Sequence, residues 1–443
     1  MKYSPVTVEL LRKYDRPGPR YTSYPTAVEF EESFDDAAYR RHLARANERA
    51  DEPLSLYVHL PFCEERCSFC GCNVVVTKKR HVAAGYLEYL YREIDMLAEA
   101  LPDRRRVSQY HWGGGTPTYL DLAEIEALHE RVARHFVVED DAEVAIEVDP
   151  RVTTLEQLKL LRRLGFNRLS MGVQDFDADV QEAVNRVQPY GITKRLFDAG
   201  RDLGFESINI DLIYGLPLQT PERFGRSIDE VLTLRPDRVA VYSYAFVPWI
   251  KANQKRILPE QLPPADVKLE LFCVARNKFL EAGYDAIDMD HFALPDDEMA
   301  VASRNRTLHR NFMGYTLKMG SDMVGVGTSA IGDVASGFAQ NEKKLSRYYQ
   351  ALDAGRFPVE RGYALDQDDT IRRDVIARMM CNFHVPKRAI EERHGIVFDE
   401  YFALELGELD AADGPREHGF VELHDDRIDV VGNGHLFVRN VAM

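Results

Sequence analysis

Apolar and polar positions alternate through most of this chain in a way that predicts strands and helices in turn. Short runs rich in β-branched and aromatic residues, typical of buried strands, lie at 54–60, 107–112, 142–148, 167–173, 207–214 and 238–245. Apolar residues recur at three- and four-residue spacing, as on one face of a helix, at 81–100, 121–136, 154–164, 192–203, 221–234 and 264–282. Gly165, Gly204 and Gly283 follow three of these stretches, where the residue after a helix is often glycine. Six strand–helix units predict a parallel sheet, and favour a full or partial barrel over a doubly wound sheet, although periodicity alone fits both.

Polar residues and glycines collect at the carboxyl end of each predicted strand. They are His59 and the cysteine-rich loop that follows it, 113–117, 147–150, 174–175, Asp211 with 214–215, and 242–245. The carboxyl ends of barrel strands converge on one mouth, where such enzymes build their active sites. Six polar ends in succession therefore predict a partial (β/α)6 barrel with a site at its mouth.

Other segments are predicted to flank this barrel. Residues 1–50 lack a strand period, and 16–25 is predicted as an extended arm because its prolines disfavour helix; it is either a linker or a cover over the site. From 284 to 360 the pattern loosens, with 286–293 predicted as one more strand and its loop. The glycines of 325–332 predict either turns or a close backbone approach to a ligand.

The last part of the chain is predicted to form a small α+β domain of winged-helix-like layout. Helical patterns at 368–381 and 387–394 precede a β-ribbon at 420–423 and 428–431, with another strand at 436–441. We therefore expect an N-terminal arm (1–50), a central domain (51–360, with barrel units to about 283) and a C-terminal domain (361–443).

Charge excludes some functions. The net charge of −16 argues against a nucleic-acid-binding surface, and residues 361–443, with 17 acidic and 10 basic side chains, carry −7, which opposes a DNA-binding winged helix.

The N-terminus has no apolar core of a signal peptide, and no run approaches the ~18 apolar residues of a membrane span. We expect a cytoplasmic protein without membrane or nucleic-acid partners, and a monomer because no apolar stripe is left over.

Four of the six cysteines, Cys63, Cys67, Cys70 and Cys72, fall within ten residues after the first predicted strand. In a chain without export signals, bunched cysteines more often bind metal or do redox chemistry than form disulfides. Zinc held by Cys63, Cys67, Cys70 and either Cys72 or His59 is one possibility. Three thiolates also suit three irons of a [4Fe–4S] cluster, which leaves the fourth iron open to a ligand.

The loop resembles that of the radical S-adenosylmethionine (SAM) superfamily, through Cys63-x3-Cys67-x-Phe69-Cys70 and the glycine-rich residues 113–117. Within it, the chain is similar to the oxygen-independent coproporphyrinogen III oxidase (dehydrogenase) family. The similar segments are 20–25, 61–63, 70–73, 111–119, 147–150, 167–176, 209–217, 308–312 and the C-terminal domain. The family usually continues past the equivalent of 439–443, so a short tail is expected beyond this sequence.

The resemblance implies an enzyme of heme biosynthesis. It would oxidatively decarboxylate two propionates of coproporphyrinogen III to the vinyls of protoporphyrinogen IX, using a 5′-deoxyadenosyl radical made from SAM. The implied cofactors are a [4Fe–4S] cluster and SAM, with two SAM molecules bound. The implied partners are an electron donor such as a flavodoxin or ferredoxin system and an electron acceptor.

Residue roles are implied by the same resemblance. Cys63, Cys67 and Cys70 would bind iron, while Cys72 stays outside the ligand set with an open role. Residues implied to line the first SAM are Tyr57 (also implied as catalytic), Phe69, Gly114, Gly115, Thr116, Glu147, Ala245 and Ile331. Gln174, Arg186 and Asp211 match positions of a two-SAM site. Without the resemblance, Gln174 fits a helix cap, Arg186 fits a charge on a helix surface, and Asp211 fits a residue that forms a turn at a strand end.

A substrate with four carboxylates needs cationic partners, and Arg20, His309 and Arg310 are the candidates. Two alternatives stay open. One is a radical-SAM-like heme chaperone without oxidase activity, which typically lacks the Cys70–Cys72 extension and the 20–25 arm. The other is a zinc-stabilised barrel that serves as a binding module.

Overall fold

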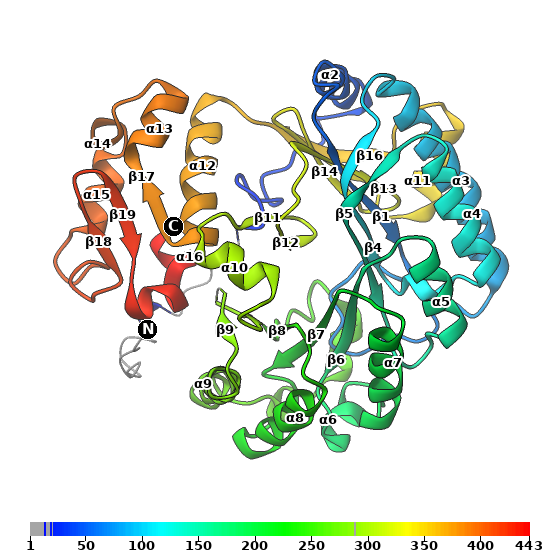
Figure 1. Ribbon diagram of the computed structural model, residues 1–443, viewed down its shortest axis with the longest axis horizontal. Helices are drawn as coiled ribbons and strands as arrows, with labels where there is room; N and C mark the ends of the chain where they lie inside the picture. Colours follow the sequence, from blue (N-terminus) through cyan, green and yellow to red (C-terminus); the bar gives the residue numbers. More distant parts are fainter. Residues whose placement is uncertain (1–12, 15–17, 20, 288) are drawn as a thin grey trace.

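The computed structural model describes residues 13–14, 18–19, 21–287 and 289–443 (Figure 1). The parallel strands at its centre include six that are each followed by a helix: β1 (Leu54–Leu60), β4 (Arg106–Gly114), β5 (Val137–Val148), β6 (Arg168–Gln174), β7 (Ser207–Tyr214) and β8 (Arg238–Ser243). The helices that follow them are α3 (Arg80–Ala100), α4 (Leu122–Ala133), α5 (Leu155–Arg163), α7 (Tyr190–Asp202), α8 (Pro221–Leu234) and α9 (Ala265–Glu281). The six predicted strand–helix units are thus confirmed.

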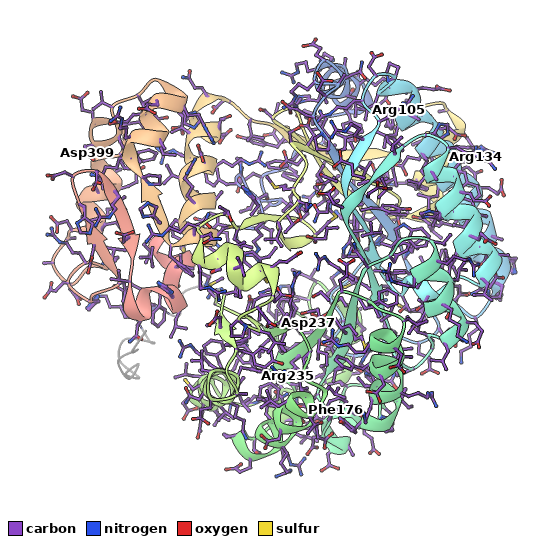
Figure 2. The ribbon with its side chains drawn as sticks, viewed as in Figure 1. Arg105, Arg134, Phe176, Arg235, Asp237 and Asp399 are labelled. Atoms are coloured by element: carbon purple, nitrogen blue, oxygen red, sulfur yellow. The ribbon has the colours of Figure 1, made fainter. Side chains whose placement is uncertain are left out.

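Local sequence signals explain where these helices begin and end. Asp121 and Thr154 form capping boxes at the starts of α4 and α5, which satisfies backbone N–H groups that have no partner within the helix. Gly165, Gly204 and Gly283 follow α5, α7 and α9 with φ angles of 95°, 78° and 85°, in the left-handed region expected after a helix. Arg235, which Figure 2 labels together with Asp237 in the turn before β8, ends α8 in the same region with φ 52°.

The sheet is an open, partial barrel of twelve strands. Beyond β1 it continues through β13 (Asp322–Val326), β14 (Ile331–Val334), β15 (Gly337–Asn341) and β16 (Val359–Ala364). Beyond β8 it continues through β10 (His291–Ala293) and β9 (Asp285–Ala286), both antiparallel. Figure 1 shows the helices α3, α4, α5, α7 and α8 along the outer side of the sheet.

Residues 325–332 form the end of β13, a turn at 327–330 and the start of β14, so the predicted turns account for part of this stretch and strands for the rest. A Cβ placed on Gly325 would lie 2.7 Å from the carbonyl oxygen of Ile331, so glycine here permits two strands to approach closely. The predicted strand within 286–293 is present as the short β9 and β10.

Shorter elements connect and cover the sheet. They are α2 (Asp36–Asn47), β2 (Phe62–Cys63), β3 (Val75–Val76), η1 (Pro117–Tyr119), α6 (Ala178–Ala183), η2 (Ala252–Arg256), η3 (Pro259–Gln261), α10 (Glu298–Arg304), β11 (His309–Asn311), β12 (Gly314–Thr316) and α11 (Leu345–Asp353). The helix α2 buries Tyr39 and Leu43 in the main hydrophobic core, so the described end of the predicted arm packs as part of the barrel. Of the arm at 16–25, residues 16, 17 and 20 lie outside the described residues.

The C-terminal segment has its own hydrophobic cluster, built around Ile371, Met380, Phe398 and Phe420. Its elements are α12 (Gln367–Asn382), β17 (His384–Pro386), α13 (Lys387–His394), α14 (Phe398–Tyr401), α15 (Ala403–Leu409), β18 (Val421–Leu423), β19 (Arg427–Val430), η4 (Gly432–Phe437) and α16 (Val438–Val441). The two helices and the ribbon are as predicted, and Figure 1 shows the segment on the open side of the sheet.

The strand predicted at 436–441 was wrong, because that stretch forms η4 and α16. Phe437, Val438 and Val441 are buried at helical spacing, but the apolar pattern of this stretch fits a strand equally well. The ribbon's third strand is β17, which pairs antiparallel with β19. No helix among the described residues combines the length and apolar character that crossing a bilayer requires.

A buried carboxylate, Glu93 on α3, ties the loop after β13 to the helical layer. Glu93 is 1% exposed and accepts hydrogen bonds from the Gly327 N–H (2.7 Å), the Tyr348 hydroxyl (2.5 Å) and the Asn341 side-chain amide (2.6 Å). Burial raises the pKa of Glu93 to about 7, despite these donors, which act in the opposite direction. The folded chain therefore holds a proton here that the unfolded chain releases at lower pH.

We expect Glu93→Gln to flatten the dependence of stability on pH. In the parent, the contribution of Glu93 to the free energy of unfolding is highest below the unfolded-state pKa of about 4.5 and falls as pH rises towards 7, because only the folded state keeps the proton. The amide stays neutral, so the variant should gain up to about 3 kcal/mol relative to the parent between pH 5 and pH 8. Urea unfolding of both proteins at pH 5, 6, 7 and 8 measures this, and parallel profiles would contradict it.

Candidate active site

A cavity of about 780 Å³ opens at the carboxyl ends of the parallel strands. It brings together the cysteine loop after β1, the glycine segment after β4, and residues from the ends of β5, β6, β7 and β8. Of the residues singled out in the sequence, those on its lining are Cys63, Cys67, Phe69, Cys70, Cys72, Gly114, Gly115, Thr116, Glu147, Gln174, Arg186 and Asp211. The polar strand ends thus share one cavity.

The cysteine loop is held by side chains from two other connections. The Asn253 side-chain amide donates to the carbonyl oxygens of Cys67 (3.2 Å), Ser68 (3.0 Å) and Cys70 (3.0 Å). The neighbouring Gln254 amide donates to the carbonyl of Phe69 at 2.9 Å and to that of Ala245 at 3.1 Å. Two adjacent residues of η2 therefore bind all four carbonyls of 67–70, while the Asn185 amide binds the carbonyl of Arg66 at 2.9 Å.

Because Asn253 binds three of these carbonyls, we expect Asn253→Ala to loosen the cysteine loop. Anaerobically reconstituted variant should hold less than about half of the parent's iron, since each lost hydrogen bond costs about 1 kcal/mol. Iron and sulfide per chain measure this. Asn185→Ala is the matched control, since it removes a single bond to the same loop and should lose less iron; equal iron in all three proteins would contradict the role of Asn253.

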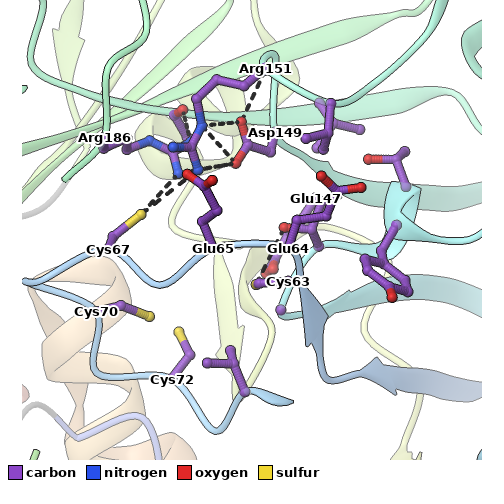
Figure 3. Close-up of a pocket in the computed structure, with 18 of the residues that line it drawn as sticks. Cys63, Glu64, Glu65, Cys67, Cys70, Cys72, Glu147, Asp149, Arg151 and Arg186 are labelled. Atoms are coloured by element: carbon purple, nitrogen blue, oxygen red, sulfur yellow. Dashed lines mark hydrogen bonds and ion pairs between the residues drawn. The ribbon is translucent and has the colours of Figure 1, made fainter. Parts of the chain in front are cut away.

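Cys67 lies beneath a cluster of charged side chains (Figure 3). The guanidinium groups of Arg186 and Arg151 lie 3.6 Å and 3.8 Å from its sulfur and donate to it. Both also bind the Asp149 carboxylate, at 3.2 Å from Arg186 and 2.7 Å from Arg151. Burial would raise the pKa of Asp149, but these two cations lower it.

The other cysteines differ in their surroundings. Burial raises the pKa of Cys63 to about 11, and its sulfur lies 3.6 Å from the Thr116 hydroxyl. Cys72 is solvent-exposed, and the hydrogen bond from its thiol is the largest cause that lowers the pKa of Cys70 to about 6. Cys72 therefore contacts a neighbouring cysteine of the loop, and nothing in this contact requires it to bind metal itself.

The glycine segment lies directly against the strand that leads to Cys63. The N–H groups of Gly115 and Thr116 donate to the carbonyls of Leu60 and Phe62, both at 2.9 Å. A Cβ on Gly115 would lie 2.7 Å from the carbonyl carbon of Pro61. Only glycine permits this approach.

Glu147 closes the next side of the cavity. Its carboxylate accepts from the Gly114 N–H at 3.0 Å and lies 3.5 Å from His111. Burial alone would raise the pKa of Glu147, but these partners lower it, so the group is charged. Tyr57 lies behind this pair rather than on the cavity lining; its ring stacks on His111 with centroids 5.9 Å apart, and its hydroxyl donates to His59 Nδ1 at 3.0 Å.

Asp211 and Gln174 occupy the far side of the cavity. The Asp211 carboxylate accepts from Ser170 (3.2 Å) and Asn209 (2.8 Å), and burial raises its pKa to about 6. Gln174 has φ 71°, an uncommon conformation for a residue with a side chain. A Cβ on Gly172 would lie 2.9 Å from the Gln174 amide nitrogen and 3.2 Å from Arg186, so a glycine here lets both side chains reach the cavity.

Several predicted site residues lie off the cavity lining. Ala245 is tied to the cysteine loop through Gln254, and Ile331 lies on β14. His309 and Arg310 lie on β11, where the Arg310 guanidinium is 4.9 Å from the centre of the Tyr315 ring. Tyr315 contacts His291 edge-on, and His291 contacts Tyr242, which lines the cavity. Arg20 lies outside the described residues.

The sequence predictions missed three groups with direct roles in this geometry. Arg151 directly follows the strand-end segment 147–150, and that position was the only available signal. Asn253 and Gln254 lie in a connection of no recognisable motif, so no sequence signal indicated them.

The residues fit an iron–sulfur cluster better than a single zinc ion. Within the described residues, no three His, Cys, Asp or Glu side chains come close enough to hold one metal ion. Three cysteines of one loop facing a large cavity suit a cluster, where each thiolate binds a different iron. The two guanidiniums at Cys67 would offset the negative charge that thiolates and sulfides bring.

The comparisons with known proteins agree with this geometry. Residues 57–231 match the family model of the radical SAM superfamily. The chain is 49% identical to an oxygen-independent coproporphyrinogen III oxidase of Salmonella typhimurium over 98% of this chain and 93% of that protein, and 44% identical to one of Pseudomonas aeruginosa over 98% and 94%. It is also similar to the solved structure of Escherichia coli coproporphyrinogen III oxidase (HemN), described as a radical SAM enzyme, with 46% identity, a TM-score of 0.92 and 96% of each chain covered.

Proposed function

This chain belongs to the oxygen-independent coproporphyrinogen III oxidases of the radical SAM superfamily, and we propose that the cavity described above carries out their reaction. Two propionates of coproporphyrinogen III are oxidatively decarboxylated to the vinyls of protoporphyrinogen IX, without O₂, in heme biosynthesis. The observation that carries the assignment to this cavity is that the three cysteines and the glycine segment share one lining.

In this proposal, Cys63, Cys67 and Cys70 hold a [4Fe–4S] cluster. Once bound there, the cluster and SAM would supply the one-electron chemistry that the decarboxylation needs. The chain's own contribution is to orient the bound groups and to exclude water from the cavity. Arg151 and Arg186 compensate charge at Cys67, and Asn253 with Gln254 fixes the loop.

The SAM-binding residues are part of the same proposal. Gly114, Gly115 and Thr116 offer backbone and hydroxyl groups beside Cys63, with Phe69 and Glu147 on the same lining. Tyr57, Ala245 and Ile331 complete the set proposed to bind the first SAM. Gln174, Arg186 and Asp211 form the opposite wall, where a second SAM would bind. A cationic sulfonium near Asp211 would favour its ionised form, since opposite charges lower a carboxyl pKa.

Substrate recognition rests on cations beyond the cavity. We propose Arg310 for a propionate, because rings of Tyr315, His291 and Tyr242 connect it to the lining. His309, on the same strand, and Arg20 of the arm complete the proposed set. Carboxylates are bound well by the planar guanidinium fork of arginine.

The redox partners, the organisation of the chain and its location are proposed as well. An acidic flavodoxin or ferredoxin system would donate electrons, and a separate acceptor would take those released by decarboxylation. A monomer of three segments, 1–50, 51–360 and 361–443, is our proposal for the chain's organisation. A cytoplasmic location suits free cysteines, which are kept reduced there.

An anaerobic assay with SAM, a reductant and coproporphyrinogen III tests the function. The expected result is protoporphyrinogen IX, with methionine and 5′-deoxyadenosine released. Absence of product from protein with an intact cluster would favour the heme chaperone, and zinc without iron–sulfur absorption near ~400 nm would overturn the enzyme proposal.

A further inference from the structure

The connection after β8 exposes apolar side chains next to positive charge. Trp249, Ile250 and Leu258 are 76%, 69% and 49% exposed, although apolar residues of this size are usually buried. Lys251, Lys255 and Arg256 lie among them. The sequence contains no acidic residue between Asp237 and Glu260, in a chain whose net charge is −16. We call residues 249–258 the basic-apolar patch.

This patch is attached to the outside of the cysteine loop. Asn253 and Gln254, in its middle, hold all four carbonyls of 67–70. No residue of 249–258 lines the cavity, whereas the acidic Glu64 and Glu65 of the same loop do. The cations and the exposed tryptophan therefore lie at the cysteine loop but outside the cavity.

We propose that the basic-apolar patch is the docking surface for a small acidic one-electron carrier protein, one that holds a reduced flavin or iron–sulfur centre. The inference rests on the proposed function, because it concerns how the cluster at Cys63, Cys67 and Cys70 is reduced. The carrier loses one electron, the cluster gains it, and no bond or proton changes place. Because Asn253 and Gln254 of the patch bind the cysteine loop, a carrier docked on the patch would lie next to that loop.

Charge and size support this occupant. An acidic carrier is repelled by the chain as a whole and attracted by this cationic surface, which favours docking there. Transient electron-transfer complexes use small interfaces, below about 1,200 Å² in total, and a few exposed apolar residues ringed by charge suit that size. The alternative, that these cations bind substrate carboxylates, is less well supported because the patch lies off the cavity lining.

Reduction kinetics test the proposal without any substrate turnover. Reconstituted parent protein and the double variant Lys255→Glu/Arg256→Glu are mixed anaerobically with flavodoxin in its fully reduced form, and bleaching of the cluster is followed. At low salt the variant should be slower by on the order of tenfold, and its rate should depend less on salt. Reduction by photoreduced deazariboflavin, a small uncharged reductant, should be unchanged.

Controls and a second readout keep the result specific. Arg388→Glu and Leu404→Ser alter an exposed charge and an exposed apolar residue of the C-terminal segment and should behave as the parent. Trp249→Ser should weaken flavodoxin binding to the cluster-free protein in calorimetry, a measurement that needs no activity. Equal flavodoxin rates and affinities in parent and variants would overturn the proposal, as would a raised KM for coproporphyrinogen III with both reductants. Loss of oxidase activity with either reductant in the parent would instead count against the proposed function.

Discussion

Cys67→Ser should reduce product formation by on the order of a thousandfold or more, because a hydroxyl is a poor ligand for iron compared with a thiolate. Cys67 is buried, and two guanidinium groups donate to its sulfur from within 3.8 Å. Serine would leave these two cations facing a neutral group. Iron and sulfide per chain, absorbance near ~400 nm and protoporphyrinogen formation measure the loss together.

Cys72→Ser is the matched control on the same loop. Cys72 is exposed and is proposed to lie outside the ligand set, so this variant should keep the parent's iron content and most of its activity. Its hydrogen bond lowers the pKa of Cys70, and a slower reconstitution at low pH is the one change we expect. A Cys72→Ser protein without iron beside a Cys67→Ser protein with iron would show that the ligand set is wrong.

The barrel was predictable because its signals are local and repeated. Each parallel strand buries at least one of its faces and contains a short apolar run, and glycines such as Gly165 end the helices in a conformation that few other residues adopt. Once six strands were parallel, their carboxyl ends had to meet, which brought Glu147 and Asp211 onto one cavity with the cysteine loop. The predicted functional roles of these residues go beyond the geometry and stay predictions.

What could not be predicted depends on contacts between distant segments. Strands β13 and β14 are four or five residues long and contain glycines, so nothing local distinguishes them from turns until β13 pairs with β1. The apolar pattern of residues 436–441 fits a helix and a strand equally well, and packing against the C-terminal cluster decides that they are helical. Asn253 acts on carbonyl groups 183 to 186 positions earlier in the chain, and backbone acceptors leave no mark in a sequence.

Gly115→Ala should disable the site by steric means alone. The added methyl carbon would lie 2.7 Å from the carbonyl carbon of Pro61 and 2.8 Å from the carbonyl oxygen of Phe62. These are backbone atoms, which cannot swing aside as a side chain can, so either β1 or the glycine segment must move. Because Cys63 follows Phe62 directly, the shift would displace the first cysteine from the other two. A displacement of about 1 Å at a reacting site can cost on the order of 10²-fold in rate.

The matched change is Gly71→Ala, on the cysteine loop between Cys70 and Cys72. No heavy atom lies within 4 Å of a Cβ there, so this variant should bind iron and turn over as the parent does. Circular dichroism and thermal unfolding should show that Gly115→Ala still folds, while SAM binding to the reconstituted protein, measured by calorimetry, falls with activity. Parent-like SAM binding and turnover in Gly115→Ala would mean that the site does not need the close approach of Gly115 to Pro61 and Phe62. It would also mean that the barrel tolerates movement at the entrance to Cys63.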